Sequence, residues 1–227
     1  LIPMTSILVV APSWVGDAVL SQPLFTRLHE RHPGLRLDVL APPWTHALFS
    51  RMVEVRSTLS SPFGHGEISL MQRYRLARGI RKQRYDQAIV LPNSFKSALI
   101  PWLAGIPIRT GFIGESRGAL LNDARRLDRA ALPLMVERFA VLAEQPGAKL
   151  ARPLPSPRLV IEESQRTATL SSLGLTAQRP IAVLCPGAEY GASKRWPADY
   201  FAQLARRLVN EGYDVWLAGS PNDNAIA

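Results

Sequence analysis

The stretch that decides the fold runs Ser6-Ile7-Leu8-Val9-Val10-Ala11-Pro12-Ser13-Trp14-Val15-Gly16-Asp17. A short apolar run gives way to a Pro/Ser/Gly turn, and an acidic residue follows where a helical pattern begins. This order predicts a strand, a tight loop and the start of a helix. In an open α/β sheet, ligands bind outside the carboxyl ends of the strands. We therefore expect a binding site beside this loop.

The same strand-loop-helix order recurs along the chain. Further strands are predicted at 35–40, where the residues alternate with period two, and at 85–91, 109–112, 181–185 and 213–218. Between them, helical patterns cover 17–31, 97–104, 133–144, 162–173 and 196–211. Strands that alternate with helices indicate parallel sheets, so the predicted fold class is α/β with Rossmann-like domains.

Proline and glycine mark the domain boundary that we predict. The chain is divided into a first domain at 1–150, a linker at 151–161 that is rich in proline, and the start of a second domain at 162–227. A single βαβ unit with a short extension cannot cover both faces of a parallel sheet. We therefore expect the second domain to be incomplete in this chain.

Composition excludes several classes of protein. With 47% hydrophobic residues in 227, the chain has enough apolar side chains for a sizeable core, and no apolar run is long enough to cross a bilayer. One cysteine, Cys185, excludes an internal disulfide, and its apolar strand predicts a buried, inert thiol. The four histidines lack the spacing of metal ligands, so no metal or other cofactor is expected.

The net charge of +9 suggests an anionic partner. Nucleic acid, a phosphorylated small molecule and an acidic membrane surface all fit this charge. No helix-turn-helix, zinc-finger or RRM pattern supports a nucleic-acid-binding module, which is kept as the non-enzymatic alternative.

The local sequence pattern allows two roles for Asp17, that of a helix cap and that of a general base. An aspartate at a helix start accepts backbone N–H bonds and complements the helix dipole. It also has the chemistry of a general base. Gly16 allows a ligand to approach the backbone closely, and Ser13 and Trp14 could form a wall for a substrate.

Two basic loop regions are candidate anion sites. In the loop 186–195, Gly187 and Ser193 precede Lys194 and Arg195 just before a helix, an arrangement that can bind phosphate but also fits a solvated basic loop. Asn93, Lys96 and Arg117 follow strands of the first domain. With Arg73 they form either an anion-binding rim or an ordinary exposed basic face.

Five ordered blocks resemble one known family. They are Pro12–Asp17, Leu91–Ala98, Leu121–Asp123, Pro133–Arg138 and Cys185–Pro197. Together they are similar to the ADP-heptose-using glycosyltransferases of lipopolysaccharide synthesis, and within them to the type II heptosyltransferases. This family has the GT-B fold, in which two Rossmann-like domains face a cleft.

The resemblance implies roles for particular residues. Asp17 matches the family's proposed general base, and Lys194 matches its phosphate-binding lysine. Ser13 and Gly16 match positions that line the donor sugar. Asn93, Lys96 and Arg73 belong to the expected acceptor side, and Arg117 is a looser match to a loop that touches acidic acceptor sugars.

The resemblance also implies the substrates, the cellular location and the reaction. The donor would be ADP-heptose and the acceptor the heptosylated inner core on Kdo–lipid A, with inversion at the transferred sugar and no metal or nucleic acid. The protein would be cytoplasmic and peripheral at the cytoplasmic face of the inner membrane. The family's later C-terminal donor motifs are absent from these 227 residues, so little or no transfer is expected from the chain alone. A related glycosyltransferase with another donor or acceptor is the alternative enzyme.

Overall fold

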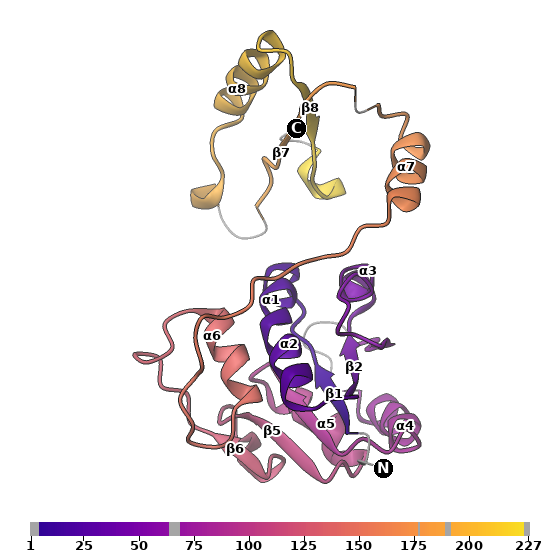
Figure 1. Ribbon diagram of the computed structural model, residues 1–227, viewed down its shortest axis with the longest axis vertical. Helices are drawn as coiled ribbons and strands as arrows, with labels where there is room; N and C mark the ends of the chain where they lie inside the picture. The colour runs from indigo at the N-terminus through magenta and orange to yellow at the C-terminus, as the bar shows by residue number, and fades with distance from the viewer. Residues whose placement is uncertain (1–4, 64–68, 177, 189–191, 225–227) are drawn as a thin grey trace. The chain divides into compact units, whose positions relative to one another are not determined.

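The computed structural model describes residues 5–63, 69–176, 178–188 and 192–224. The chain forms two compact units, Leu1–Ile161 and Glu162–Ala227, which we describe separately (Figure 1). The predicted linker, 151–161, packs on the first unit. Gln22 and Arg158 exchange two hydrogen bonds of 2.8 Å, and Val160 N donates to Arg51 O.

A six-stranded parallel sheet forms the first unit. Its strands, in chain order, are β1 (Ser6–Val10), β2 (Arg36–Ala41), β3 (Ser57–Ser60), β4 (Gln87–Val90), β5 (Ile108–Phe112) and β6 (Asp123–Arg125). Their order across the sheet is β3-β2-β1-β4-β5-β6. This is the Rossmann order, whose switch point lies between β1 and β4, where successive connections diverge and leave a crevice.

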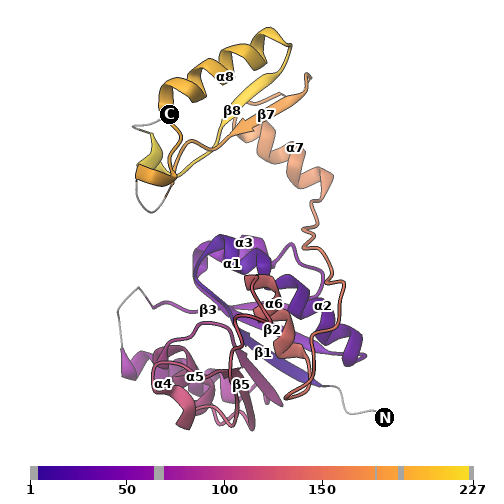
Figure 2. The same ribbon diagram turned by 90° about the vertical axis from the view of Figure 1, so that its left-hand side faces the viewer.

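Helices cover both faces of this sheet (Figure 2). One face carries α1 (Val15–Leu20), α2 (Gln22–Arg31), α3 (His46–Phe49) and α6 (Met135–Ala140), and the other carries α4 (Leu70–Arg81) and α5 (Phe95–Leu103). Ile7 and Val9 of β1 pack into the first layer, whereas Leu8 and Val10 pack into the second. Because β1 is buried on both faces, its sequence is a continuous apolar run.

One helix and one strand differ from the sequence predictions. The helix expected at 17–31 is two helices, with the break at Ser21, whose N–H bonds Ala18 O. Pro23 lies in the first turn of α2, where its missing N–H costs nothing. The edge strand β6 was not predicted, because its three residues, Asp123–Arg125, carry no apolar run.

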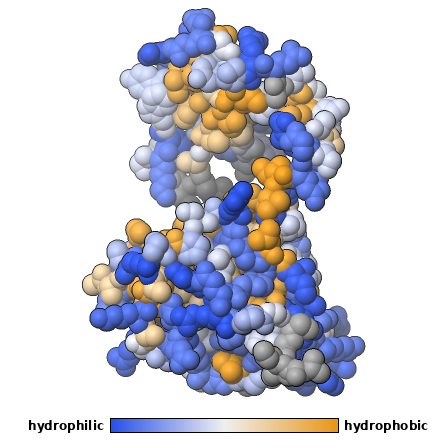
Figure 3. Space-filling model, in the orientation of Figure 1, coloured by the Kyte–Doolittle hydropathy of each residue, from blue (hydrophilic) through white to orange (hydrophobic). Residues whose placement is uncertain are grey.

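The second unit pairs β7 (Ile181–Leu184) with β8 (Asp214–Leu217) in parallel, and also contains α7 (Glu163–Ser172) and α8 (Ala198–Asn210). Among its described residues only Pro186 is buried. Apolar side chains gather on the face of this unit that Figure 3 shows. Val183 of β7 and Leu217 of β8, which point to opposite faces of the strand pair, are about half exposed. Cys185 is exposed too, so its prediction as a buried core thiol was wrong. Both faces of the two-stranded sheet therefore carry partly exposed apolar side chains.

The described helices include none with the length and hydropathy to cross a membrane.

Candidate functional site

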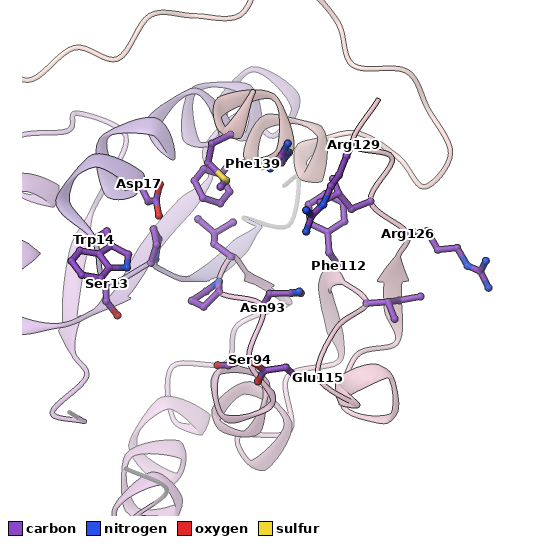
Figure 4. Close-up of a pocket in the computed structure, with 17 residues that line it drawn as sticks. Ser13, Trp14, Asp17, Asn93, Ser94, Phe112, Glu115, Arg126, Arg129 and Phe139 are labelled. Atoms are coloured by element: carbon purple, nitrogen blue, oxygen red, sulfur yellow. The ribbon is translucent and has the colours of Figure 1, made fainter. Parts of the chain in front are cut away.

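A pocket of about 870 Å³ opens beyond the carboxyl ends of β1, β4 and β5, at the switch point of the sheet. Figure 4 shows its side chains, with Asp17 on one side of Asn93 and Arg129 on the other. The lining brings together segments more than 100 residues apart in the chain: Pro12, Ser13, Trp14, Asp17, Leu91, Pro92, Asn93, Ser94, Phe112, Ile113, Glu115, Arg126, Leu127, Arg129, Met135, Arg138 and Phe139.

Asp17 projects into this pocket from the first turn of α1. The N-cap of α1 is Trp14, which makes no side-chain cap bond, and within the described part of the chain the Asp17 carboxylate has neither a hydrogen bond nor an ion pair. Partial burial raises the pKa of this carboxyl above its ordinary value. The structure therefore leaves the carboxylate available to accept a proton instead of using it as a helix cap.

The loop after β4 is held by local hydrogen bonds that present Asn93. Ser94 is the N-cap of α5, and its Oγ accepts a bond from Ser97 N. The Ser97 hydroxyl lies within 3.1 Å of Pro92 O and 2.7 Å of Ser94 O, and it donates to these carbonyls. With the backbone fixed on both sides, Asn93 is exposed on the pocket wall.

Lys96 and Arg73 line a second, smaller pocket of about 300 Å³. This pocket shares Ser13, Pro92, Ser94 and Glu115 with the first. Arg73 is buried, with its guanidinium 4.0 Å above the Phe63 ring and a bond from Nη1 to Lys96 O. The two predicted acceptor-side cations are therefore neighbours, although Arg73 is not the exposed rim residue that was expected.

Arg117 does not have the position expected of an acceptor contact. Its side chain is fully buried, and its guanidinium donates to the carbonyls of Phe112 and Pro92. Burial lowers the pKa of Arg117 to about 10. Because its donors are directed at these two backbone oxygens, Arg117 fastens the loops after β4 and β5 together and is not presented to a ligand.

The sequence did not predict several of the residues that line the larger pocket. Arg126, Arg129 and Arg138 add positive charge, while Phe112 and Phe139 supply apolar wall. Within the described part of the chain, the Arg126 and Arg129 side chains have no hydrogen-bond or ion-pair partner. Arg126 and Arg129 were visible in the sequence as basic residues, but only the fold places them in the same pocket as Asp17.

In the second unit, Ser193, Lys194 and Arg195 are exposed just before α8. Gly187 lies against Asp223, since a β-carbon built on it would be 2.2 Å from the Asp223 carboxyl. Hydrogen bonds from Ser220 and the nearby charge of Arg195 lower the pKa of Asp223, a residue the sequence reading did not single out. Trp196 packs against Tyr200 and Phe201, which fixes the end of the loop on α8. Glu189–Gly191 of this loop lie outside the described residues.

Gly16 is exposed on α1 but is not part of the pocket lining. A β-carbon at Gly16 would meet no atom within 4 Å, which leaves open space for an approaching group. Among the described residues, no group of three or more His, Cys, Asp or Glu side chains is arranged to hold a metal ion.

Comparison with known proteins assigns the class. The model of glycosyltransferase family 9 (heptosyltransferase) matches residues 73–227, and the chain belongs to this family. This confirms the resemblance carried by the five sequence blocks.

The relatives define the similarity more closely. The chain is 49% identical to lipopolysaccharide heptosyltransferase 2 of Salmonella typhimurium over 223 residues, covering 96% of this chain and 64% of that protein. It also matches the structure of ADP-heptose lps heptosyltransferase II from Escherichia coli with a TM-score of 0.91 and 45% identity, covering 98% of this chain and 66% of that one.

A third likeness concerns the fold alone. The glycosyl transferase family 9 structure from Veillonella parvula is 22% identical, with a TM-score of 0.83, and covers 98% of this chain and 64% of that one. The structural matches confirm the predicted GT-B fold class. The chain spans about two thirds of the length of the relatives that it matches.

Proposed function

We propose that this chain carries the acceptor site and part of the donor site of a heptosyltransferase II. The reaction moves L-glycero-D-manno-heptose from ADP-heptose to the first heptose of the lipopolysaccharide inner core. The observation that carries this proposal is the unpaired, partly buried Asp17 carboxylate in a basic pocket at the switch point of the sheet.

In this proposal Asp17 is the general base. An acceptor hydroxyl oxygen forms the new bond to the anomeric carbon of heptose while the bond from that carbon to the ADP oxygen breaks. The hydroxyl proton passes to Asp17, and ADP leaves with the electron pair, so the sugar inverts in one displacement. The raised pKa of Asp17 supports this role because it makes the carboxylate a better proton acceptor near neutral pH.

Positive charge around the two pockets suits the acceptor, which carries Kdo carboxylates and phosphate. Asn93 is exposed on the wall of the larger pocket, and Lys96 and Arg73 line the smaller one. To these predicted residues we add Arg129, whose guanidinium group can bind carboxylate or phosphate through paired hydrogen bonds. Arg138 also lines the larger pocket, but its guanidinium donates to Leu132 O and Pro133 O. Arg117 is assigned a structural role.

On the donor side, the proposal uses the loop before α8. Lys194 and Arg195 would bind the pyrophosphate of ADP-heptose together with Ser193 and the backbone at Gly187. Lys194 and Ser193 are exposed and, within the described part of the chain, their side chains have no hydrogen-bond partner, which supports this assignment. Ser13 and Gly16 would line the heptose. Charge that develops on the departing ADP would be stabilised by the Lys194 ammonium.

The acceptor is anchored in lipid, whereas the donor is a water-soluble nucleotide sugar. We therefore place the reaction at the cytoplasmic face of the inner membrane, with the protein bound peripherally. From residues 1–227 alone we expect little or no transfer.

The test is an assay of heptose transfer from ADP-heptose onto once-heptosylated Kdo–lipid A. It compares the intact gene product, its Asp17→Asn variant and residues 1–227 alone. We expect the variant to lose turnover by 10²- to 10⁴-fold, the range of a general base, while ADP-heptose binding is kept. Asp199→Asn, which changes an exposed aspartate of α8, is the matched control. Turnover near normal in Asp17→Asn would remove the general base from the proposal. Transfer only from another nucleotide sugar would replace the donor.

A further inference from the structure

One helix of the first unit presents an unusual outer surface. The α4 surface consists of three exposed apolar residues and three exposed cations: Leu70, Met71, Tyr74, Arg75, Arg78 and Lys82. Leu70 is 60% exposed, Met71 64% and Tyr74 47%. Large apolar side chains grouped at such exposure on one helix end indicate a contact surface more often than single exposed ones do.

The opposite side of the same helix explains why this surface faces outward. Arg73, Ala77 and Ile80 are buried, and they recur at the spacing of one helical face. Ala77 and Ile80 belong to the core layer that also contains Ala98 and Ile100 of α5. At 100° per residue, Met71, Arg75, Arg78 and Lys82 lie opposite this buried stripe.

The charges of the α4 surface are all of one sign. Residues 70–84 contain six basic residues and no acidic one. Two of the six are engaged, since Arg73 bonds Lys96 O and Arg81 bonds Leu103 O and Ala104 O. The side chains of Arg75, Arg78 and Lys82 have no hydrogen bond or ion pair among the described residues. An ordinary solvated helix face intersperses both signs of charge.

We propose that the α4 surface docks this protein on an anionic phospholipid bilayer. Arg75, Arg78 and Lys82 contact lipid phosphates, and Leu70, Met71 and Tyr74 enter the boundary between headgroups and acyl chains. This pairing of exposed cations with exposed apolar side chains is typical of interfacial binding. Nucleic acid would match the cations but would leave Leu70 and Met71 in water, so the lipid surface fits better.

This inference rests on the proposed function for its membrane, because a lipid-linked acceptor requires one. Its test does not use heptose transfer. Residues 1–227 are sedimented with vesicles of pure phosphatidylcholine, and with vesicles that contain about one third phosphatidylglycerol, at low and at physiological salt. We expect binding to the anionic vesicles only, and weaker binding as salt is raised.

Two variants separate the contribution of the cations of the α4 surface from that of its apolar side chains. Arg75→Ser/Arg78→Ser should weaken binding to anionic vesicles by about 30-fold, from the usual contribution of a basic residue near such a surface. Leu70→Ser/Met71→Ser/Tyr74→Ser should weaken it by about tenfold or more, including at physiological salt where charge is screened. The matched controls are Arg206→Ser/Arg207→Ser on α8 and Val53→Ser, all at exposed positions, and they should bind like the unchanged chain.

The outcomes separate the hypotheses. If both α4 variants bind anionic vesicles as well as the controls do, the proposal is wrong. It is also wrong if the unchanged chain binds no vesicle, or binds DNA of equal charge in preference to vesicles. If vesicle binding depends on α4 but the intact gene product transfers no heptose, this proposal is retained and the enzymatic one is rejected.

Discussion

Asn93 lies directly over Gly114, so close that a β-carbon at position 114 would be 2.3 Å from Asn93 Nδ2. The two residues belong to the loops after β4 and β5, and this contact joins the loops at the pocket wall. Any side chain at position 114 would have to displace the Asn93 amide, because a β-carbon does not approach another heavy atom at that distance.

Gly114→Ala should therefore move Asn93 out of its place in the pocket. We expect the KM for the acceptor to rise about tenfold, the effect of one lost hydrogen bond, with little change in the KM for ADP-heptose. Gly118→Ala is the control, since a β-carbon there meets nothing within 4 Å. Equal kinetics for the two variants would show that Asn93 does not contact the acceptor.

Arg117→Met tests whether this residue is structural. The substitution removes the donors to the buried carbonyls of Pro92 and Phe112, and each unsatisfied polar group costs about 1–3 kcal/mol. We expect the free energy of unfolding to fall by about 3 kcal/mol in denaturant titrations. Arg129→Met, at an exposed position, should change stability little. A stable Arg117→Met variant with weak acceptor binding would restore the predicted ligand contact.

Asp17→Asn should stabilise the fold, in contrast to the loss of turnover expected for the same variant. The pKa of Asp17 is raised in the folded state from an ordinary value of 3.8, so the folded chain binds the proton more tightly than the unfolded chain does. The carboxylate therefore lowers stability progressively as the pH rises from about this value through the folded pKa. The free energies of unfolding of the variant and the unchanged chain, measured by thermal unfolding, should differ by less than about 1 kcal/mol, since solvent screens the partly exposed group. The gain should be larger at pH 7 than at pH 4, and a gain that is equal at both pH values contradicts the argument.

Lys194→Ala should weaken the binding of ADP-heptose to the intact gene product. A hydrogen bond to a charged group contributes about 1.5–3 kcal/mol, which corresponds to a 10- to 150-fold higher Kd. Calorimetric titration measures this change directly, and the KM for the acceptor should stay the same. Lys149→Ala, at an exposed position in the first unit, provides the comparison. An unchanged Kd for ADP-heptose would show that Lys194 does not bind its phosphates.

The sequence predicts what depends on local pattern. β1 and β4 follow from runs of apolar residues, because a parallel strand that is buried on both faces must be apolar on both. β2 follows from the alternation at 35–40, and β7 and β8 follow from apolar runs although they are only partly buried. The loop from Pro12 to Asp17 was recognised for the same reason, since turn residues and an acid follow such a run. The loop 186–195 and the region of Asn93, Lys96 and Arg117 were identified from their basic residues, but the sequence did not show which of these side chains are exposed.

Features that depend on long-range packing could not be predicted in this way. Arg117 is buried because two loops from different strands close over it, and a lone arginine in a loop gives no sign of this. Arg126 and Arg129 reach the Asp17 pocket only through the order of the strands in the sheet. Cys185 follows an apolar strand that is itself only partly buried, so its apolar neighbours did not predict its exposure.

The pairing of β1 with β4 sets the distance between two of the strand ends that lie beneath the pocket. Val10 and Val90 are register partners, so the chains that lead to Asp17 and Asn93 leave the sheet one inter-strand spacing apart, about 4.8 Å. That separation is maintained by the hydrogen-bond ladder and not by the loops. The Val10–Val90 register therefore fixes where the chain segments leading to Asp17 and Asn93 begin, whatever residues the loops contain.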